Sequence, residues 1–405
     1  MLTRNTIKIQ LLFLSVLSWY HLSNGASFYS NKGIGLLSYF TTGQGMGMGG
    51  IGIAIIDNIS LNHLNPATLV PTPMTRLSGT FLYQTVSMKS PGEKGFSRYA
   101  NANGLHFLMP LKRNISFSIG LTPVTLVDFE MRSEGEVSYR KQVRGNGGLN
   151  RVVLSLFYAP IEKIYLGFSF NYNFANIEET WVVDFYSDEF NDTQDVLSTR
   201  LWGPNFTTGL IFRLRKDWTM GVIYSTATQL RAKTSARYNF NEAPYNFAEE
   251  SLAQYHQVNF PYAWGIGSAY TIKHKVLLGA DFYTQAWHQF ALDGKKLPGY
   301  HNSYRLSLGG QYTPSKDPLS SYFKRVCYRA GFFQETLYFE YQTRNKIKEY
   351  GATLGLGFPF YHDSGRIDLA AEIGKRGTLA QNPVEENFVN VFITITVGER
   401  WFQRR

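Results

Sequence analysis

The residue types that most often perform catalysis or bind metals are few and scattered in this 405-residue chain. Its eight histidines include no His-Glu-x-x-His zinc motif, and a single cysteine, Cys327, cannot form an internal disulfide or a Cys-x-x-Cys site. No Ser-His-Asp grouping is apparent, although such groups need not be close in sequence. We therefore expect no catalytic residue, no metal site and no cofactor, and we rank an enzyme such as a lipase or protease last.

Two segments resemble ligand-binding loops without completing either pattern. The glycine-rich run 43–50 lacks the Gly-Lys-Ser/Thr ending of a phosphate-binding loop. Asp188, Asp192 and Asp195 are spaced like calcium ligands, but the central glycine and terminal glutamate of an EF-hand are missing. We expect no nucleotide at the first segment and interpret the second as a solvated loop.

A third set of ionisable side chains lies within segments that alternate between apolar and polar residues. The set is His106, Asp281, Arg305, Arg329, Asp368 and Glu372. Each falls on the face opposite the apolar stripe, which predicts that they line the inside of a barrel, because an arginine facing lipid would cost about 2–4 kcal/mol. Charges at membrane depth generally pair, so we expect at least one ion pair among Asp281, Arg305 and Arg329. We interpret the set as a network that stiffens the barrel; a polar stretch of a substrate path is the alternative.

The chain after about residue 75 has a dominant period of two residues. In 165–175 the apolar face holds Leu166, Phe168, Phe170, Tyr172 and Phe174, and the other face holds Gly167, Ser169, Asn171, Asn173 and Ala175. The same split recurs in 115–122 and 389–398. Helical spacing explains none of these runs, so they are predicted to be β-strands.

The composition favours strands that cross a membrane. Aromatic residues make up 16% of the chain and charged residues only 17%, below the quarter usual in soluble proteins. The mean hydropathy is nevertheless −0.21, which suits a barrel in which only alternate residues face lipid. The formal charge of +10 fits an anionic lipid surface as well as a nucleic acid. We expect outer-membrane lipids and lipopolysaccharide as partners, and no nucleic acid.

The lengths of the links between strands separate a barrel from a soluble β-sandwich, which also alternates. About fourteen strands are expected between residues 75 and 400. Short turns are expected at 111–114, 160–163, 215–217 and 272–274, and long polar loops at 125–147, 178–199 and 232–256. Short periplasmic turns and long outer loops are typical of bacterial barrels. The link 314–325 is the exception, because it is long where a short turn is expected.

Both ends of the chain differ from the predicted barrel. Arg4 and Lys8 precede an apolar run, 9–22, and small residues follow it, which is the layout of a secretory signal peptide spanning 1–25. Residues 401–405 form a short basic tail. Together these features predict an exported protein of the cell outer membrane.

The segment 26–74 precedes the predicted strands, is rich in glycine and does not alternate from residue 33 onward. It holds, in order, Gly45, Gly47, Gly49, Gly50, Ala54, Asp57, Asn58, Asn65, Pro66 and Ala67. This ordered combination resembles the start of the FadL/TodX family of outer-membrane transporters for hydrophobic compounds. The resemblance implies an all-β, fourteen-stranded antiparallel barrel with this segment as an N-terminal plug. It also implies a lateral opening at a kink in the third strand. Gly120 and Pro123 lie there, and a proline removes one ladder bond while a glycine lets the strand bend. The alternatives are that Pro123 only ends the strand at the outer rim, or that Pro261 marks the opening.

Two functions follow from this resemblance. The leading hypothesis is passive uptake of hydrophobic small molecules, such as fatty acids, through the outer membrane. The alternative is a barrel of this type that transports nothing and serves as a subunit of an outer-membrane secretion or assembly complex with a protein partner.

Overall fold

The computed structural model describes residues 26–39, 41–134, 139–187, 189–190, 192–240, 248–250, 253–341, 345–360 and 364–401. The segment expected to be a signal peptide (1–25), Asp188 and residues 402–405 of the basic tail lie outside the described residues. No helix in the described residues is long and apolar enough to cross a membrane.

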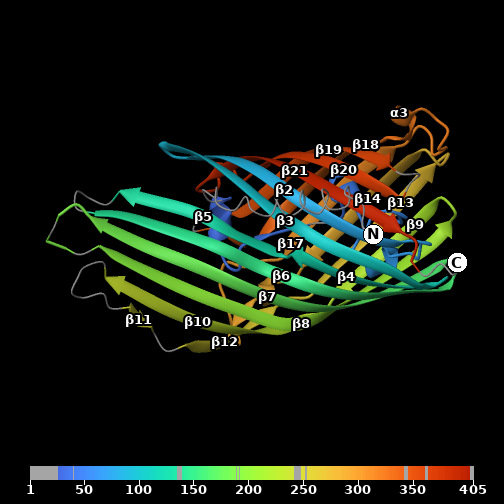
Figure 1. The fold of residues 1–405 in the computed structure, drawn as a ribbon. Coiled ribbons are helices and arrows are strands. Elements are labelled where there is room, and N and C mark those ends of the chain that lie inside the picture. Colours follow the sequence, from blue (N-terminus) through green and yellow to red (C-terminus); the bar gives the residue numbers. More distant parts are fainter. Residues whose placement is uncertain are drawn as a thin grey trace, which may run out of the picture.

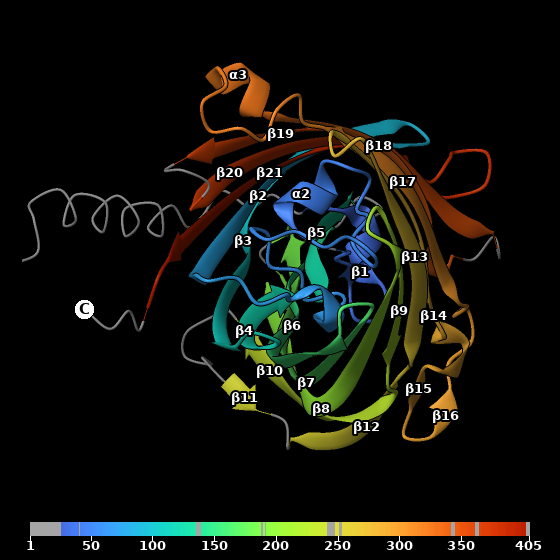
Figure 2. The ribbon, with the colours of Figure 1, turned by 90° about the vertical axis from the view of Figure 1, so that its right-hand side faces the viewer.

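The wall is a closed barrel of 14 antiparallel strands (Figures 1 and 2). Local breaks divide several of these strands into two labelled elements. The bounds are β2 (Thr75–Ser90), β3 (Glu93–Lys112), β4 (Ile115–Pro123), β5 (Thr125–Glu134), β6 (Tyr139–Ile161), β7 (Ile164–Phe185), β8 (Thr193–Arg215), β9 (Trp218–Ser225), β10 (Thr228–Phe240), β11 (Ala248–Glu250), β12 (Gln254–Phe260), β13 (Ala263–Ile272), β14 (Val276–Gln285), β15 (Ala291–Leu292), β16 (Lys295–Lys296), β17 (Ser303–Tyr312), β18 (Cys327–Glu340), β19 (Lys346–Phe360), β20 (Gly365–Arg376) and β21 (Glu385–Glu399). Pairing of β2 with β21 closes the barrel.

The period-two pattern sorts side chains between lipid and lumen as expected. On β7, Phe168 and Phe174 are 47% and 38% exposed on the outer face, whereas Asn171 and Asn173 are buried inside. The inward amides bond across the wall, because Asn171 Nδ2 donates to Thr207 Oγ1 at 2.9 Å. In a membrane barrel the outer face contacts lipid and is apolar, whereas the inner face is polar. The side chains of β7 follow this arrangement.

The three stretches expected to be long polar loops are largely strand, which corrects that part of the prediction. β5 and β6 occupy most of the first stretch, and the ends of β7 and β8 occupy most of the second. The ladder between β6 and β7 runs from Tyr139 opposite Phe185 to Ile161 opposite Ile164. Strands that continue beyond the membrane are wet on both faces, so they lose the apolar stripe while their backbones stay paired. Figure 1 shows these extensions at the end opposite the C-terminus.

The two ends of the barrel differ in their connections. Short turns join β6 to β7, β8 to β9 and β13 to β14 at the end where β21 finishes. This is the periplasmic end, because short turns face the periplasm in bacterial barrels. The link between β17 and β18 lies at the same end and contains the short helix α3 (Tyr322–Arg325).

The segment before β2 lies inside the ring of strands (Figure 2). Its elements are η1 (Phe28–Asn31), β1 (Leu36–Leu37), α2 (Gly43–Met46) and η2 (Pro66–Thr68). Thr42 caps α2 by accepting a hydrogen bond from Gly45 N, and Asn65 caps η2 by accepting one from Ala67 N. The segment is the expected N-terminal plug, and we call residues 26–74 the plug from here on.

Candidate functional site

Glycines let the plug and the wall approach backbone to backbone. A side chain at Gly331 of β18 would overlap the backbone of Met48 and Gly49, and one at Gly167 of β7 would overlap Pro66. Gly49 itself has a φ of +76°, a conformation that glycine adopts without strain. The dense glycines of the motif therefore serve close packing inside the barrel, as do glycines of the wall that the sequence pattern did not single out.

Asn65 holds two parts of the plug together. Its Nδ2 donates to the carbonyl oxygen of Ile53 at 2.6 Å, and its Oδ1 accepts from Ala67 N at 3.0 Å. The side chain is fully buried, so neither bond can be replaced by bulk water.

Replacing Asn65 by Asp is expected to loosen the plug more than replacing it by Ala. Aspartate keeps the acceptor for Ala67 N but sets a carboxylate oxygen against the Ile53 carbonyl, whereas alanine only removes the two bonds. A buried polar group left unsatisfied costs about 1–3 kcal/mol. Hydrogen exchange of peptides from 50–70 measures the loss; equal protection in both variants would contradict it.

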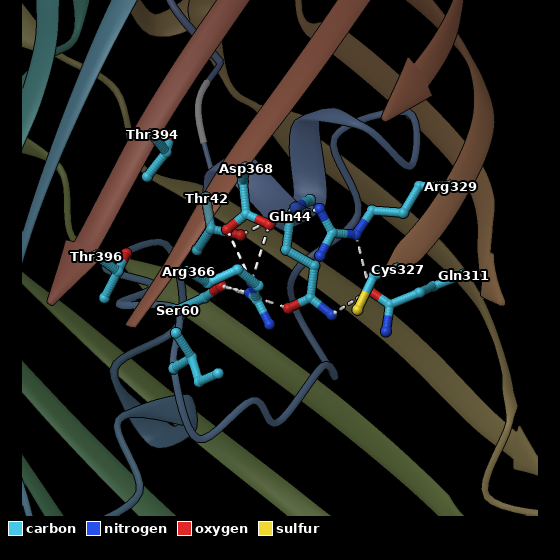
Figure 3. Close-up of polar contacts among 12 residues, drawn as sticks. Thr42, Gln44, Ser60, Gln311, Cys327, Arg329, Arg366, Asp368, Thr394 and Thr396 are labelled. Carbon is cyan, nitrogen blue, oxygen red and sulfur yellow. Dashed lines mark hydrogen bonds and ion pairs between the residues drawn. The ribbon is translucent and has the colours of Figure 1, made fainter. Parts of the chain in front are cut away.

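An ion-pair chain joins the plug to the wall near the periplasmic end (Figure 3). Asp57 of the plug pairs with Arg366 at 2.5 Å, Arg366 pairs with Asp368 at 2.8 Å, and Asp368 pairs with Arg329 at 2.6 Å. Gln44 of the plug joins through Gln311, whose Oε1 accepts from both Gln44 Nε2 and Arg329 Nε. The network therefore ties the plug to the wall at two points, Gln44 within α2 and Asp57 after it.

The expected ion pair among Asp281, Arg305 and Arg329 is wrong, because each has a different partner. Asp281 accepts from the plug amides of Gly52 and Ile53 at 2.6 and 2.8 Å. Arg305 pairs with Glu335 at 2.6 Å, directly across from β17 to β18. Arg329 reaches past a whole strand, β19, to Asp368 on β20. The six ionisable residues singled out from the sequence are all buried, but their partners include residues that the sequence did not indicate.

A second ionic cluster lies above the first and was missed from the sequence. Arg376 pairs with Glu349 at 2.5 Å and with Glu386 at 2.7 Å. Ser27 Oγ and Phe28 N of the plug donate to the same Glu386 at 2.8 and 2.7 Å. The start of the plug is therefore tied to β20 and β21 at the extracellular half of the lumen. Glu349 and Glu386 lie near the ends of their strands. From the sequence alone, a glutamate buried in the lumen at such a position looks the same as one exposed to water.

His106 faces the plug rather than a charged wall group. Its ring stacks on the ring of His63 with centroids 4.5 Å apart, and His63 Nε2 lies 3.1 Å from Ser118 Oγ. Gly120 lies directly beneath both rings, where a Cβ would meet His106 and His63 at 2.6 and 3.0 Å. Gly120, expected at a lateral opening, is thus enclosed by side chains from the lumen.

The wall is interrupted above this point, between β3 and β5. β3 pairs with β4 only up to Leu105 opposite Leu121. In the described part of the chain no strand pairs with that edge of β3 between Glu93 and Gly104. β5 instead follows β6 away from β3, and Figure 1 shows the two directions diverging. Gly120 is paired on both sides, with His106 and Val153, so the break begins just above it.

A β-bulge in β3 marks the start of this break. Thr80 of β2 lies opposite Gly104 and Phe81 lies opposite Ala102, which leaves Asn103 as the extra residue. Gly104 has a φ of +140°, which a residue with a side chain rarely adopts. Bulges bend a strand and end its pairing. A glycine inside a strand pattern is the sequence signal for one, and Asn103-Gly104 was overlooked in the sequence.

The plug covers part of the free edge of β5. β1 pairs with it through Leu36 opposite Leu126, and Ser38 N donates to Val124 O at 2.9 Å. Among the described residues, none pairs in this way with the facing edge of β3 between Glu93 and Gly104. A plug strand therefore forms one side of the break.

Two cavities meet at this break. The lower cavity has a volume of about 120 Å³ and the upper about 140 Å³. Both are lined by Leu37, Ser38, Tyr39, Pro123, Arg305 and Glu335. The upper cavity is also lined by Asn101 and Asn103 of β3 and by Leu126 of β5. It therefore lies between the two edges of the break, and Pro123 stands where both cavities reach the wall.

A family model described as BamG matches residues 1–405, the whole chain. The chain belongs to the BamG family. A search of curated proteins gave no match.

Several solved structures resemble this BamG-family chain, among them a FadL homologue and TodX. A Pseudomonas aeruginosa FadL homologue has a TM-score of 0.64 at 13% identity, and the CymD monoaromatic hydrocarbon channel has 0.62 at 16% identity. The Pseudomonas putida toluene transporter TodX has 0.60 at 14% identity. Each alignment covers 90% of this chain and 99% of the other. At these identities the likeness shows the fold, and the expected FadL/TodX-like outer-membrane barrel is confirmed.

Proposed function

We propose that this barrel gives small hydrophobic molecules a passive route between its lumen and the outer leaflet of the membrane. The observation that carries the proposal is the upper cavity, which is lined by both edges of the break between β3 and β5. A molecule in this cavity reaches the membrane without crossing a hydrogen-bonded ladder. Strand pairing elsewhere closes the wall, because lipid cannot satisfy free backbone groups.

The plug supports a sideways route rather than a path straight through the barrel. Asp57, Arg366 and Asp281 join plug and wall by buried contacts, and breaking a buried ion pair costs about 3–5 kcal/mol. A route through the break leaves these contacts in place. Structures with a TM-score of 0.60 or above include one described as a monoaromatic hydrocarbon channel and one as a toluene transporter, which agrees with this proposal.

The cavity volumes favour a small substrate. Each is near 120–140 Å³, whereas pockets for drug-sized ligands are about 300–1,000 Å³. The linings are mixed, with Leu126 beside Asn101 and Glu335 in the upper cavity. A volume of about 150 Å³ is enough for one benzene molecule. We therefore propose single-ring hydrocarbons as the substrate class ahead of long-chain fatty acids.

A bulky group placed at the break tests the proposal. Asn101 lines the upper cavity, and the adjacent Ala100 points to the other face of β3. Each is changed to cysteine in a Cys327→Ser background and modified with an aromatic methanethiosulfonate. Toluene uptake by Gram-negative cells that lack their own channel of this type is then measured.

We expect modification of Asn101→Cys to lower uptake to the rate of cells without the barrel, and a reductant to restore it. The same adduct on Ala100→Cys should leave uptake unchanged. Unaltered uptake with fully modified Asn101→Cys would exclude the route through the break.

A role as a subunit of a membrane complex is the second candidate. The connection between β7 and β8, at the extracellular tip, presents Tyr186 and Phe190 with 61% and 60% of their surface exposed. Exposed aromatic side chains are enriched in protein interfaces. A stoichiometric partner that co-purifies in mild detergent and is lost on changing both residues to serine would support this role.

A further inference from the structure

The link between β17 and β18 exposes large apolar side chains on the periplasmic side. Leu319 is 94% exposed and Phe323 of α3 is 74% exposed, while Tyr322 is 42% exposed. The link is also longer than the other turns at this end, as the sequence indicated. Apolar groups this exposed in water are unfavourable unless something covers them.

The position of the link points to lipid as the cover. Figure 2, which looks along the barrel from the periplasmic end, shows α3 outside the ring of strands rather than over the lumen. Tyr312 and Tyr328, opposite each other at the ends of β17 and β18, face outward with 47% and 38% exposure. Tyr328 Oη donates to Phe323 O at 3.1 Å. The apolar side chains of the link therefore continue the lipid-facing surface of the wall.

The charges of the link match an anionic membrane surface. Lys316, Lys324 and Arg325 lie beside the apolar residues, and Arg325 stacks on Tyr322 at 5.4 Å. The single acidic residue, Asp317, accepts a hydrogen bond from Leu319 N within the link. Basic groups beside buried aromatic and aliphatic side chains are typical of segments that lie in the membrane interface.

We propose that residues 314–325 form an interfacial anchor in the periplasmic leaflet. Leu319 and Phe323 insert at the boundary between headgroups and acyl chains, and Lys316 and Lys324 contact anionic phospholipid headgroups. The anchor extends the wall sideways at one point of the rim. It fixes the depth of β17 and β18, the strands whose Arg305 and Arg329 hold the ionic network.

Spin labels in lipid nanodiscs test the anchor. A nitroxide is attached at Phe323→Cys in the Cys327→Ser background, and its collisions with oxygen and with a neutral nickel chelate report depth. Leu354→Cys, outward on β19 with 66% exposure, is the lipid reference; Leu379→Cys, in the β20–β21 connection with 43% exposure, is the water reference. Both leaflets are accessible to the reagents in a nanodisc.

The label at 323 is expected to lie between the two references and nearer to 354, with more oxygen collisions and fewer nickel collisions than the label at 379. Adding phosphatidylglycerol to the disc should move the label at 323 deeper into the membrane, because the lysines bind its anionic headgroups. The double change Lys316→Gln, Lys324→Gln should abolish this effect of phosphatidylglycerol. A label at 323 with the nickel accessibility of 379 would overturn the proposal and leave this surface for a periplasmic protein. Shielding from both reagents would also overturn it, because the link would then pack on the barrel itself.

Discussion

Replacing Arg305 by methionine is expected to lower the free energy of unfolding by about 3–5 kcal/mol, the range for breaking a buried ion pair. Arg305 is the ion-pair partner of Glu335 at 2.6 Å, and both side chains are almost completely buried. The guanidinium also lies over the ring of Phe333 at 3.9 Å and that of Tyr39 at 4.5 Å. Its loss leaves the Glu335 carboxylate buried without its cation.

The double variant Arg305→Met, Glu335→Leu separates this cause from lost packing. An apolar pair of similar volume often replaces a buried ion pair without loss, so the double variant should recover most of the stability. Urea titrations of the folded barrel in detergent, followed by its heat-dependent gel mobility, measure both variants. If the double variant is as unstable as Arg305→Met, the packing on Phe333 and Tyr39 matters more than the charge.

The inward positions of this network could be predicted from the sequence, whereas the pairing could not. Period two alone places Arg329 and Asp368 inside the barrel. Their contact depends on Gly355 and Gly357 of the strand between them, because a Cβ at Gly357 would meet Arg329 and Asp368 at 2.5 and 2.9 Å. The space that the missing side chains leave above β19 depends on the register of β18, β19 and β20. A slip of one residue would place side chains in that space.

The break in the wall shows the same division between local and long-range information. Proline and glycine weaken a ladder locally, which is why the sequence points to Gly120 and Pro123. The structure places Gly120 within paired strands and begins the break above it, opposite the bulge at Asn103 and Gly104. The upper part of β3 has no partner on this side because β5 pairs with β6 and turns away from β3. The residues of the third strand alone do not predict the direction that β5 takes.

The plug depends on the wall glycines as much as on its own, and Gly331→Val tests this. The Cβ of a valine at 331 would overlap the backbone of Met48 and Gly49. Neither side can move freely, because Gly49 N donates to Thr353 Oγ1 at 2.8 Å and Met48 is fully buried. The change should displace α2 from the wall and cost about 1–3 kcal/mol, the usual range for overpacking.

Gly79→Val is the matched control, because it adds the same side chain to another wall strand. Gly79 faces outward, and a Cβ there meets only Leu105 Cδ1 at 3.9 Å. Valine favours strands more than glycine does, so this variant should keep or raise stability. Hydrogen exchange of peptides covering 43–56 should rise in Gly331→Val and stay unchanged in Gly79→Val. If the amides of 43–56 stay protected from exchange in Gly331→Val, the plug does not need close contact with β18. The contacts of Asp57 and Asp281 would then be enough to hold it in the lumen.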